Sequence, residues 1–204
     1  MFKDLGTRVA TVWEEMRPVT KNLIEGALTT GAVAPLAKNQ QYYYDAKVDW
    51  EVSDLLTAVD ELSITPAVAA DADKRHELEL LANSCVRVLL DRSASAEVFI
   101  LLAMRAIRAN DFSGLDKLTD VLAERFSASE IAEIIRQTEV PQIRALAFET
   151  LAMLSVQLVA PLLDDPLYTQ IAIIALEQKA WEFESDEARE ALDQFDLEGE
   201  IMEP

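Results

Sequence analysis

Apolar residues recur every three or four positions along most of this chain, a spacing typical of amphipathic helices. In residues 73–92 the spacing places five side chains on one stripe: Leu78, Leu81, Ala82, Cys85 and Leu89. Residues 95–110 are apolar on nearly every side, which predicts a buried helix. Residues 111–126 again carry a one-sided apolar stripe. From residue 73 onward the pattern therefore predicts consecutive helices.

Capping residues and prolines indicate where the later helices begin and end. Ser127 and Glu130 have the spacing of a capping box, so a helix should begin there. Pro141 stands where a first helical turn tolerates proline. That helix should stop before Pro161, because proline cannot continue the hydrogen-bond ladder. The Asp-Pro pair at residues 165–166 predicts the start of the next helix by the same device.

The connections between these helices are short, which predicts an all-α protein. Two architectures fit: a closed helical bundle, or a short stack of antiparallel helix pairs. Either would occupy a domain of residues 51–196. Its last helix should bury Ala188, Leu192 and Phe195. An acidic tail that frays should follow at residues 197–204.

Residues 140–151, VPQIRALAFETL, resemble the second helix of a HEAT repeat. That family has an apolar residue followed by arginine, then small residues and a leucine. Here the places are held by Ile143, Arg144, Ala147 and Leu151. The resemblance covers one repeat window, and it implies a curved stack of helix pairs that binds macromolecules, usually proteins, without catalysis. For Arg144 it implies a structural role, bracing the stack through an acidic neighbour.

The first 50 residues form an N-terminal arm with a pattern of their own. Apolar residues at alternating intervals of three and four, from Phe2 to Met16, predict an amphipathic helix. Pro18 should kink or restart it, and a second helix should end at Gly31. Because the arm is amphipathic and carries no net charge, we expect it to dock on a partner or to form a homodimer.

Residues 42–50 hold three of the four tyrosines of the chain and one of its three tryptophans. Apolar or aromatic residues alternate with mostly charged ones, which predicts an extended, half-buried segment. A helix would also gather Tyr43, Ala46 and Trp50 on one side. The extended segment would be either a strap whose aromatics complete the core or a contact for a partner. The arm thus supplies the interaction candidates: Phe2, Leu5, Val9, Trp13, Tyr42, Tyr43, Tyr44 and Trp50.

The formal net charge of −19 is distributed unevenly. Residues 1–50 are neutral, whereas residues 51–204 hold 12 basic and 31 acidic residues, which accounts for the whole excess. The negative electrostatic field of this excess charge repels nucleic-acid phosphates and anionic lipid surfaces, so neither is an expected partner. It suits solubility, a basic protein partner or imitation of a nucleic acid.

Cys85 is the single cysteine, so the chain can form no intramolecular disulfide. Its place on an apolar stripe is typical of an inert core thiol. Residues 98–107 and 151–163 are the most apolar stretches, and both are too short to span a membrane. The N-terminus lacks the apolar run of a signal peptide. These features favour a cytoplasmic protein.

Few residues indicate enzyme chemistry. His76, the single histidine, lies among charged residues and is expected to be solvated. Together with Asp71 and Asp73 it could bind a metal ion, but a solvated helix N-terminus is the favoured interpretation of these residues. The spacing of Glu130 and Glu133 could pair two carboxylates, although capping explains the first and solvent the second. No cofactor-binding or zinc-ligand pattern is present, so no catalytic, cofactor or metal residue is assigned.

The function favoured by the sequence is a non-enzymatic protein-interaction or scaffold module that recognises its partner by a helical surface and an acidic face. One alternative is an acidic inhibitor, such as an immunity or DNA-mimic protein, that occupies a basic site. A less favoured alternative is an enzyme based on carboxylates or on His76, which would require a pocket of convergent polar groups.

Overall fold

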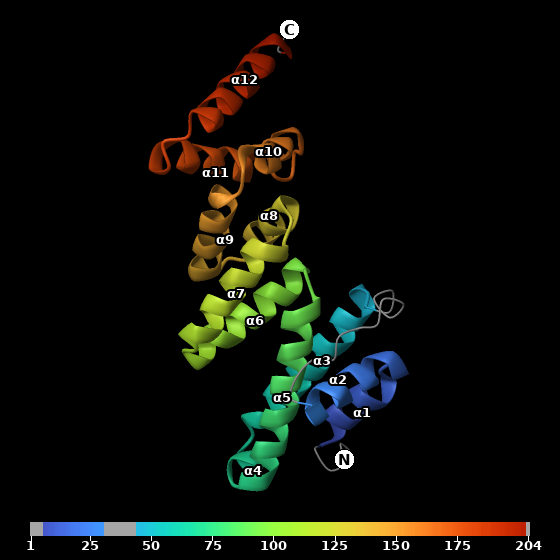
Figure 1. The fold of residues 1–204 in the computed structure, drawn as a ribbon. Helices are drawn as coiled ribbons and strands as arrows, with labels where there is room; N and C mark the ends of the chain where they lie inside the picture. Colours follow the sequence, from blue (N-terminus) through green and yellow to red (C-terminus); the bar gives the residue numbers. More distant parts are fainter. Residues whose placement is uncertain (1–5, 31–43, 203–204) are drawn as a thin grey trace. The chain divides into compact units, whose positions relative to one another are not determined.

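The structure is a computed structural model that describes residues 6–30 and 44–202 (Figure 1). Within these ranges the protein is all-helical and contains no strand, which confirms the predicted all-α class. The chain divides into two compact units, Met1–Ser93 and Ala94–Pro204.

The first unit is built around one long helix, α5, which contacts α2, α3 and α4, while α1 contacts α3. Its helices are α1 (Thr7–Glu15), α2 (Pro18–Thr30), α3 (Ala46–Ser63), α4 (Pro66–Ala69) and α5 (Ala72–Arg92). Leu55 and Leu56 of α3 are fully buried, as are Leu78 and Cys85 of α5. The predicted stripe of α5 is therefore its core face, and Cys85 is a core residue.

A buried carboxylate ties α2 to α3 in this unit. Glu51 is only 3% exposed. It accepts hydrogen bonds from the hydroxyl of Thr20, from the backbone N–H of Arg17 at 3.1 Å, and from Nε of Arg17. Arg17 also donates to both oxygens of Asp45, at 3.1 and 2.7 Å. A carboxylate this buried is stable in a fold only when its oxygens are satisfied, so this cluster fixes how the arm packs.

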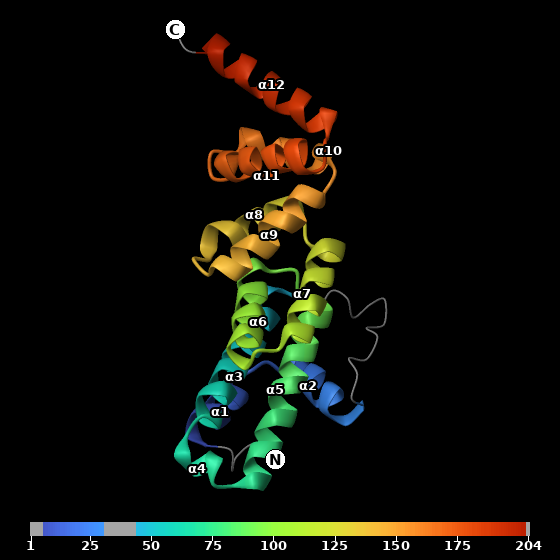
Figure 2. The same cartoon turned by 90° about the vertical axis from the view of Figure 1, so that its left-hand side faces the viewer.

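The second unit is a short stack of helix pairs, one of the two architectures that the sequence left open. Its helices are α6 (Ala96–Ala109), α7 (Phe112–Arg125), α8 (Ala128–Gln137), α9 (Pro141–Met153), α10 (Val156–Val159), η3 (Ala160–Asp164), α11 (Thr169–Glu182) and α12 (Asp186–Met202). Figures 1 and 2 show α6 beside α7 and α8 beside α9. The pairs then stack, because α6 contacts α8 and α7 contacts α9.

Aromatic and aliphatic side chains form the core of this unit. The rings of Phe99 and Phe126 meet edge to face, with centroids 5.8 Å apart. The amphipathic α8 buries Ile131, Ile134 and Ile135 completely. Arg144 of α9 braces the end of α8, but its Nη1 donates to the backbone carbonyls of Ile135 and Thr138 at 3.0 and 3.2 Å. The partner is thus backbone, where the HEAT resemblance implied an acidic side chain.

The extended segment predicted for residues 42–50 is wrong for residues 46–50, which belong to α3. Asp45 is the N-cap, and its side chain accepts from the N–H of Val48 at 2.9 Å. Tyr42 and Tyr43 lie outside the described residues. Because α3 runs unbroken from Ala46 to Ser63, residue 50 lies inside a helix and not at the end of an arm. The helix that Asp45 caps formed in place of the extended segment that the alternating pattern predicted.

One predicted helix start is confirmed, and another is wrong. Ser127 caps α8 by accepting from the N–H of Glu130 at 3.2 Å, but the Glu130 carboxylate accepts from the N–H of Ala96 on another helix. The capping box is therefore only half formed. Asp165 accepts from the N–H of Leu167 in a turn, and α11 starts four residues later, at Thr169.

Within the described ranges, no single helix has the length and hydropathy to cross a membrane. One pair of helices, Pro141–Met153 with Val156–Asp164, meets both criteria together, but it is bent by 119°.

The buried Glu51 cluster leads to a stability prediction. Arg17→Met removes the charged partner of a buried carboxylate and should lower the free energy of unfolding by about 2–4 kcal/mol. Arg8→Met is the matched control, because Arg8 is 54% exposed and pairs with Glu61 and Asp54 on the same helix α3. It should cost at most about 1 kcal/mol. Urea unfolding measures both values, and equal losses would contradict a special role for the buried pair.

Candidate functional site

The last two helices of the second unit form a hairpin with a groove between them. The turn at residues 183–185 contains Glu184 in the left-handed region, at φ 53°. Arg189 of α12 closes the hairpin: its Nη2 donates to the carbonyl of Ala180 at 2.8 Å, and its Nη1 donates to Asp186. The groove thus lies beside a turn that backbone and guanidinium hydrogen bonds hold in place.

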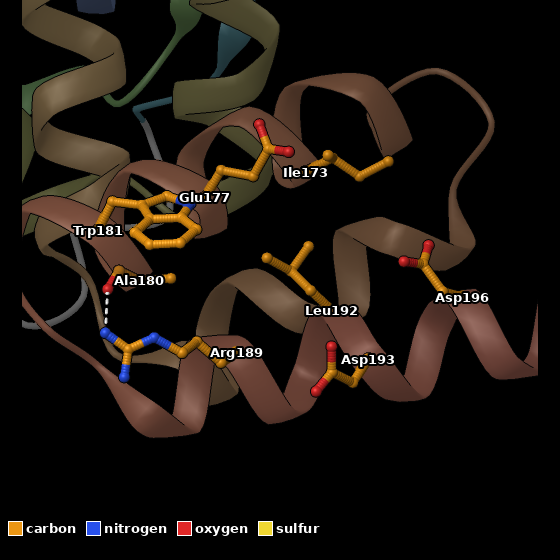
Figure 3. A pocket seen from close by; sticks show the side chains of 8 residues that line it. All are labelled: Ile173, Glu177, Ala180, Trp181, Arg189, Leu192, Asp193 and Asp196. Carbon is orange, nitrogen blue, oxygen red and sulfur yellow. Dashed lines mark hydrogen bonds between the residues drawn. The ribbon is translucent and has the colours of Figure 1, made fainter.

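The groove has a volume of about 330 Å³ and combines apolar walls with a carboxylate rim (Figure 3). Its lining is Ile173, Glu177, Ala180 and Trp181 from α11, and Arg189, Leu192, Asp193 and Asp196 from α12. Figure 3 shows Trp181 and Leu192 on opposite sides of the open space. The volume is at the lower end of the range for ligand pockets, so the groove suits a small group or a single side chain.

Three carboxylates at this groove have no partner within the described residues. No hydrogen bond or ion pair engages Glu177, Asp193 or Asp196 there, whereas the guanidinium of Arg189 is already bonded to Ala180 and Asp186. The local excess of negative charge is therefore free to act on an occupant. A cation would be attracted to this groove and an anion repelled.

The outer side of α11 continues the groove as a partly apolar stripe. Ile174, Glu177 and Trp181 follow one another at intervals of three and four residues, so they share one helix face. Ile174 is 40% exposed and Trp181 is 77% exposed. A tryptophan this exposed contributes little to the core of its own chain, and tryptophan is enriched at the centres of protein interfaces.

A second group of carboxylates in this unit is fully engaged. Glu133 accepts from Arg136 at 2.7 and 2.5 Å, from Gln137 at 2.6 Å and from the hydroxyl of Tyr168 at 3.0 Å. The Arg136 hydrogen bonds lower the pKa of Glu133 to about 2. Burial raises the pKa of Glu130, which accepts from the N–H of Ala96. Glu130 and Glu133 therefore tie helices together, and this group leaves Glu133 no free face for a ligand.

The arm residues predicted as interaction candidates do not share one surface among the described residues. Phe2, Leu5, Tyr42 and Tyr43 lie outside the described residues. Val9 is 1% exposed and packs in the core of the first unit, so it is not available to a partner. Trp13 is half-buried, with Nζ of Lys21 5.9 Å from its ring centroid.

The other two arm candidates flank the start of α3. The hydroxyl of Tyr44 donates to Asp49 at 2.6 Å, which holds this phenol against its own chain. Trp50 is 65% exposed. His76 is exposed, as its charged sequence context predicts, and within the described part of the chain no group of His, Cys, Asp and Glu residues could hold a metal ion.

The α11–α12 groove was not predicted from the sequence, although one signal for it was present. The buried positions of α11 include Ala172, Leu176 and Ala180, and Trp181 falls beside this stripe, on the polar side. A tryptophan on the polar side of a helix, followed in sequence by several acids, is expected to be exposed to solvent. Which acids remain unpaired could not be read from the sequence.

Comparisons of the chain with models of known families, with curated proteins and with solved structures find no match. The resemblance of residues 140–151 to a HEAT repeat therefore stays a prediction.

The engaged carboxylate of Glu133 leads to a pH prediction. Its pKa is lowered from 4.5 to about 2, so its stabilising contribution is complete above about pH 4.5 and is lost as the pH falls toward 2. Glu133→Gln should lower stability at neutral pH and give a shallower loss between pH 5 and pH 2. Glu149→Gln, at an exposed position on α9, is the control and should match the wild type. Urea midpoints across this pH range test the expectation, and an unchanged slope in Glu133→Gln would contradict it.

Proposed function

We propose that this protein is a non-enzymatic interaction module that binds a basic segment of a partner protein at the α11–α12 groove. The observation that carries the proposal is the set of three unpaired carboxylates beside the exposed Trp181. Interfaces combine a central aromatic anchor with charged groups at the rim, and this groove offers both.

The charge of the whole chain supports the same choice of partner. Its net charge is −19, and the entire excess lies in residues 51–204, which include the groove. Such a field attracts a basic protein over a distance comparable to the Debye length and speeds its association. It also opposes the approach of nucleic acid, which we therefore do not propose as a ligand.

The stacked helix pairs of the second unit support a scaffold role. A stack of helix pairs presents long surfaces with little need for an enclosed active site, and the HEAT-like window at residues 140–151 fits such a stack. In the described part of the arm, α1 and α2 pack on α3 and α5 of the same chain. That packing and the like charge of two copies favour a different protein as partner over a homodimer.

Binding to an array of short peptides of graded net charge tests the proposal. We expect the basic peptides to bind and their affinity to fall as salt is added. The double variant Asp193→Asn with Asp196→Asn should weaken binding about tenfold.

The matched control removes two acids elsewhere in the same unit, by Asp116→Asn with Asp120→Asn on the exposed side of α7. This variant has the same net charge as the groove variant and should bind like the wild type. Failure of every basic peptide to bind would contradict the proposed function, and equal weakening of both variants would remove the groove from it.

A further inference from the structure

We infer that the α11–α12 groove is a pocket for one arginine side chain of the partner, with the guanidinium stacked on Trp181. This inference rests on the proposed function, because it specifies the residue by which a basic segment would be recognised. It also predicts a selectivity that net charge alone does not produce.

The apolar walls of the groove fit the stem of such a side chain. Ile173 and Leu192 line the groove together with Trp181, and the open space separates the indole from Leu192 (Figure 3). An arginine buries its methylene stem along apolar surface while its head remains polar. A volume of about 330 Å³ admits one long side chain and excludes a folded element of the partner.

The exposed indole favours a guanidinium over an ammonium. Trp181 is 77% exposed, so a face of its ring is available to an occupant. A guanidinium is planar and weakly hydrated, and it stacks on an aromatic face more often than the compact ammonium of lysine does. Among the three aromatic ring types, tryptophan gives the strongest cation–π attraction.

The carboxylates supply the complementary acceptors. Glu177 lies on α11, and Asp193 and Asp196 lie on α12, so both helices that border the groove carry carboxylates (Figure 3). A guanidinium has five N–H donors in a plane and can engage carboxylates on two sides while it stacks.

Arg189 does not block this pocket, although it is a cation in the lining. Its guanidinium donates to the carbonyl of Ala180 at 2.8 Å and to Asp186, so its charge is compensated at the turn. Three uncompensated carboxylates then remain for the incoming guanidinium within the described residues. An anionic ligand would meet all three and is excluded by charge.

Nuclear magnetic resonance with small probes tests the pocket without a known partner. We would titrate the chain with N-acetyl-arginine methylamide and with its lysine counterpart, and follow the indole N–H signals of the three tryptophans. The Trp181 signal, assigned by its loss in Trp181→Leu, should shift with the arginine probe at about 3- to 30-fold lower concentration than with the lysine probe. The signals of Trp13 and Trp50 should stay unchanged.

Two variants locate the effect. Trp181→Leu should weaken binding of a basic peptide from the array by about 3- to 30-fold. Trp50→Leu removes a tryptophan of similar exposure, 65%, from the first unit and should bind like the wild type. Both side chains are mostly solvent-exposed, so neither change should unfold the chain, which circular dichroism verifies.

The outcomes separate this inference from the proposed function. Basic peptides that bind without any preference for arginine over lysine would overturn the arginine pocket and leave the interaction module standing. An arginine probe that shifts Trp181 while no basic peptide binds would support the pocket and contradict the proposed function. If spermidine shifts the Trp181 signal at lower concentration than the arginine probe, the groove is a polyamine site and the inference is wrong.

Discussion

Every helix of this protein depends on burying one apolar face against a neighbour, because helices of this length are only marginally stable alone in water. In the first unit α2 and α3 both pack against α5. In the second unit α6 packs against α8, and α7 packs against α9. The groove follows from the same constraint. At the end of the second unit α12 packs against α11, and Ile174 and Trp181 of α11 stay exposed to solvent.

The acidic residues have two different physical roles, and their partners distinguish them. Glu51 and Glu133 are held in hydrogen-bond networks that include an arginine, and they stabilise the contacts between helices. Burial opposes the ionisation of Glu51, but hydrogen bonds from Thr20 and Arg17 outweigh it and hold the pKa of this carboxyl below its usual value. The carboxylates around Trp181 have no such engagement within the described residues, so their charge is directed outward. Three of these carboxylates line one groove beside an exposed tryptophan.

The error at residues 46–50 shows how two local signals compete. Alternation of aromatic and mostly charged residues is real there, but helical spacing also gathers Ala46 and Trp50, and Asp45 can cap a helix. The cap satisfies backbone N–H groups that a lone strand would leave unpaired, so the helix is the more stable choice. At Glu130 the opposite happened: a local capping role was predicted, and a contact with Ala96 on another helix replaced it.

The sequence by itself determined the all-α class, the approximate span of most helices, the buried Cys85 and the solvated His76, because periodicity, caps and charge context act over a few residues. Only the tertiary structure decided which carboxylates are paired and that Trp181 borders a groove with Leu192. Those properties depend on how helices distant along the chain cross and pack, and periodicity within one helix carries no information about its neighbours' side chains.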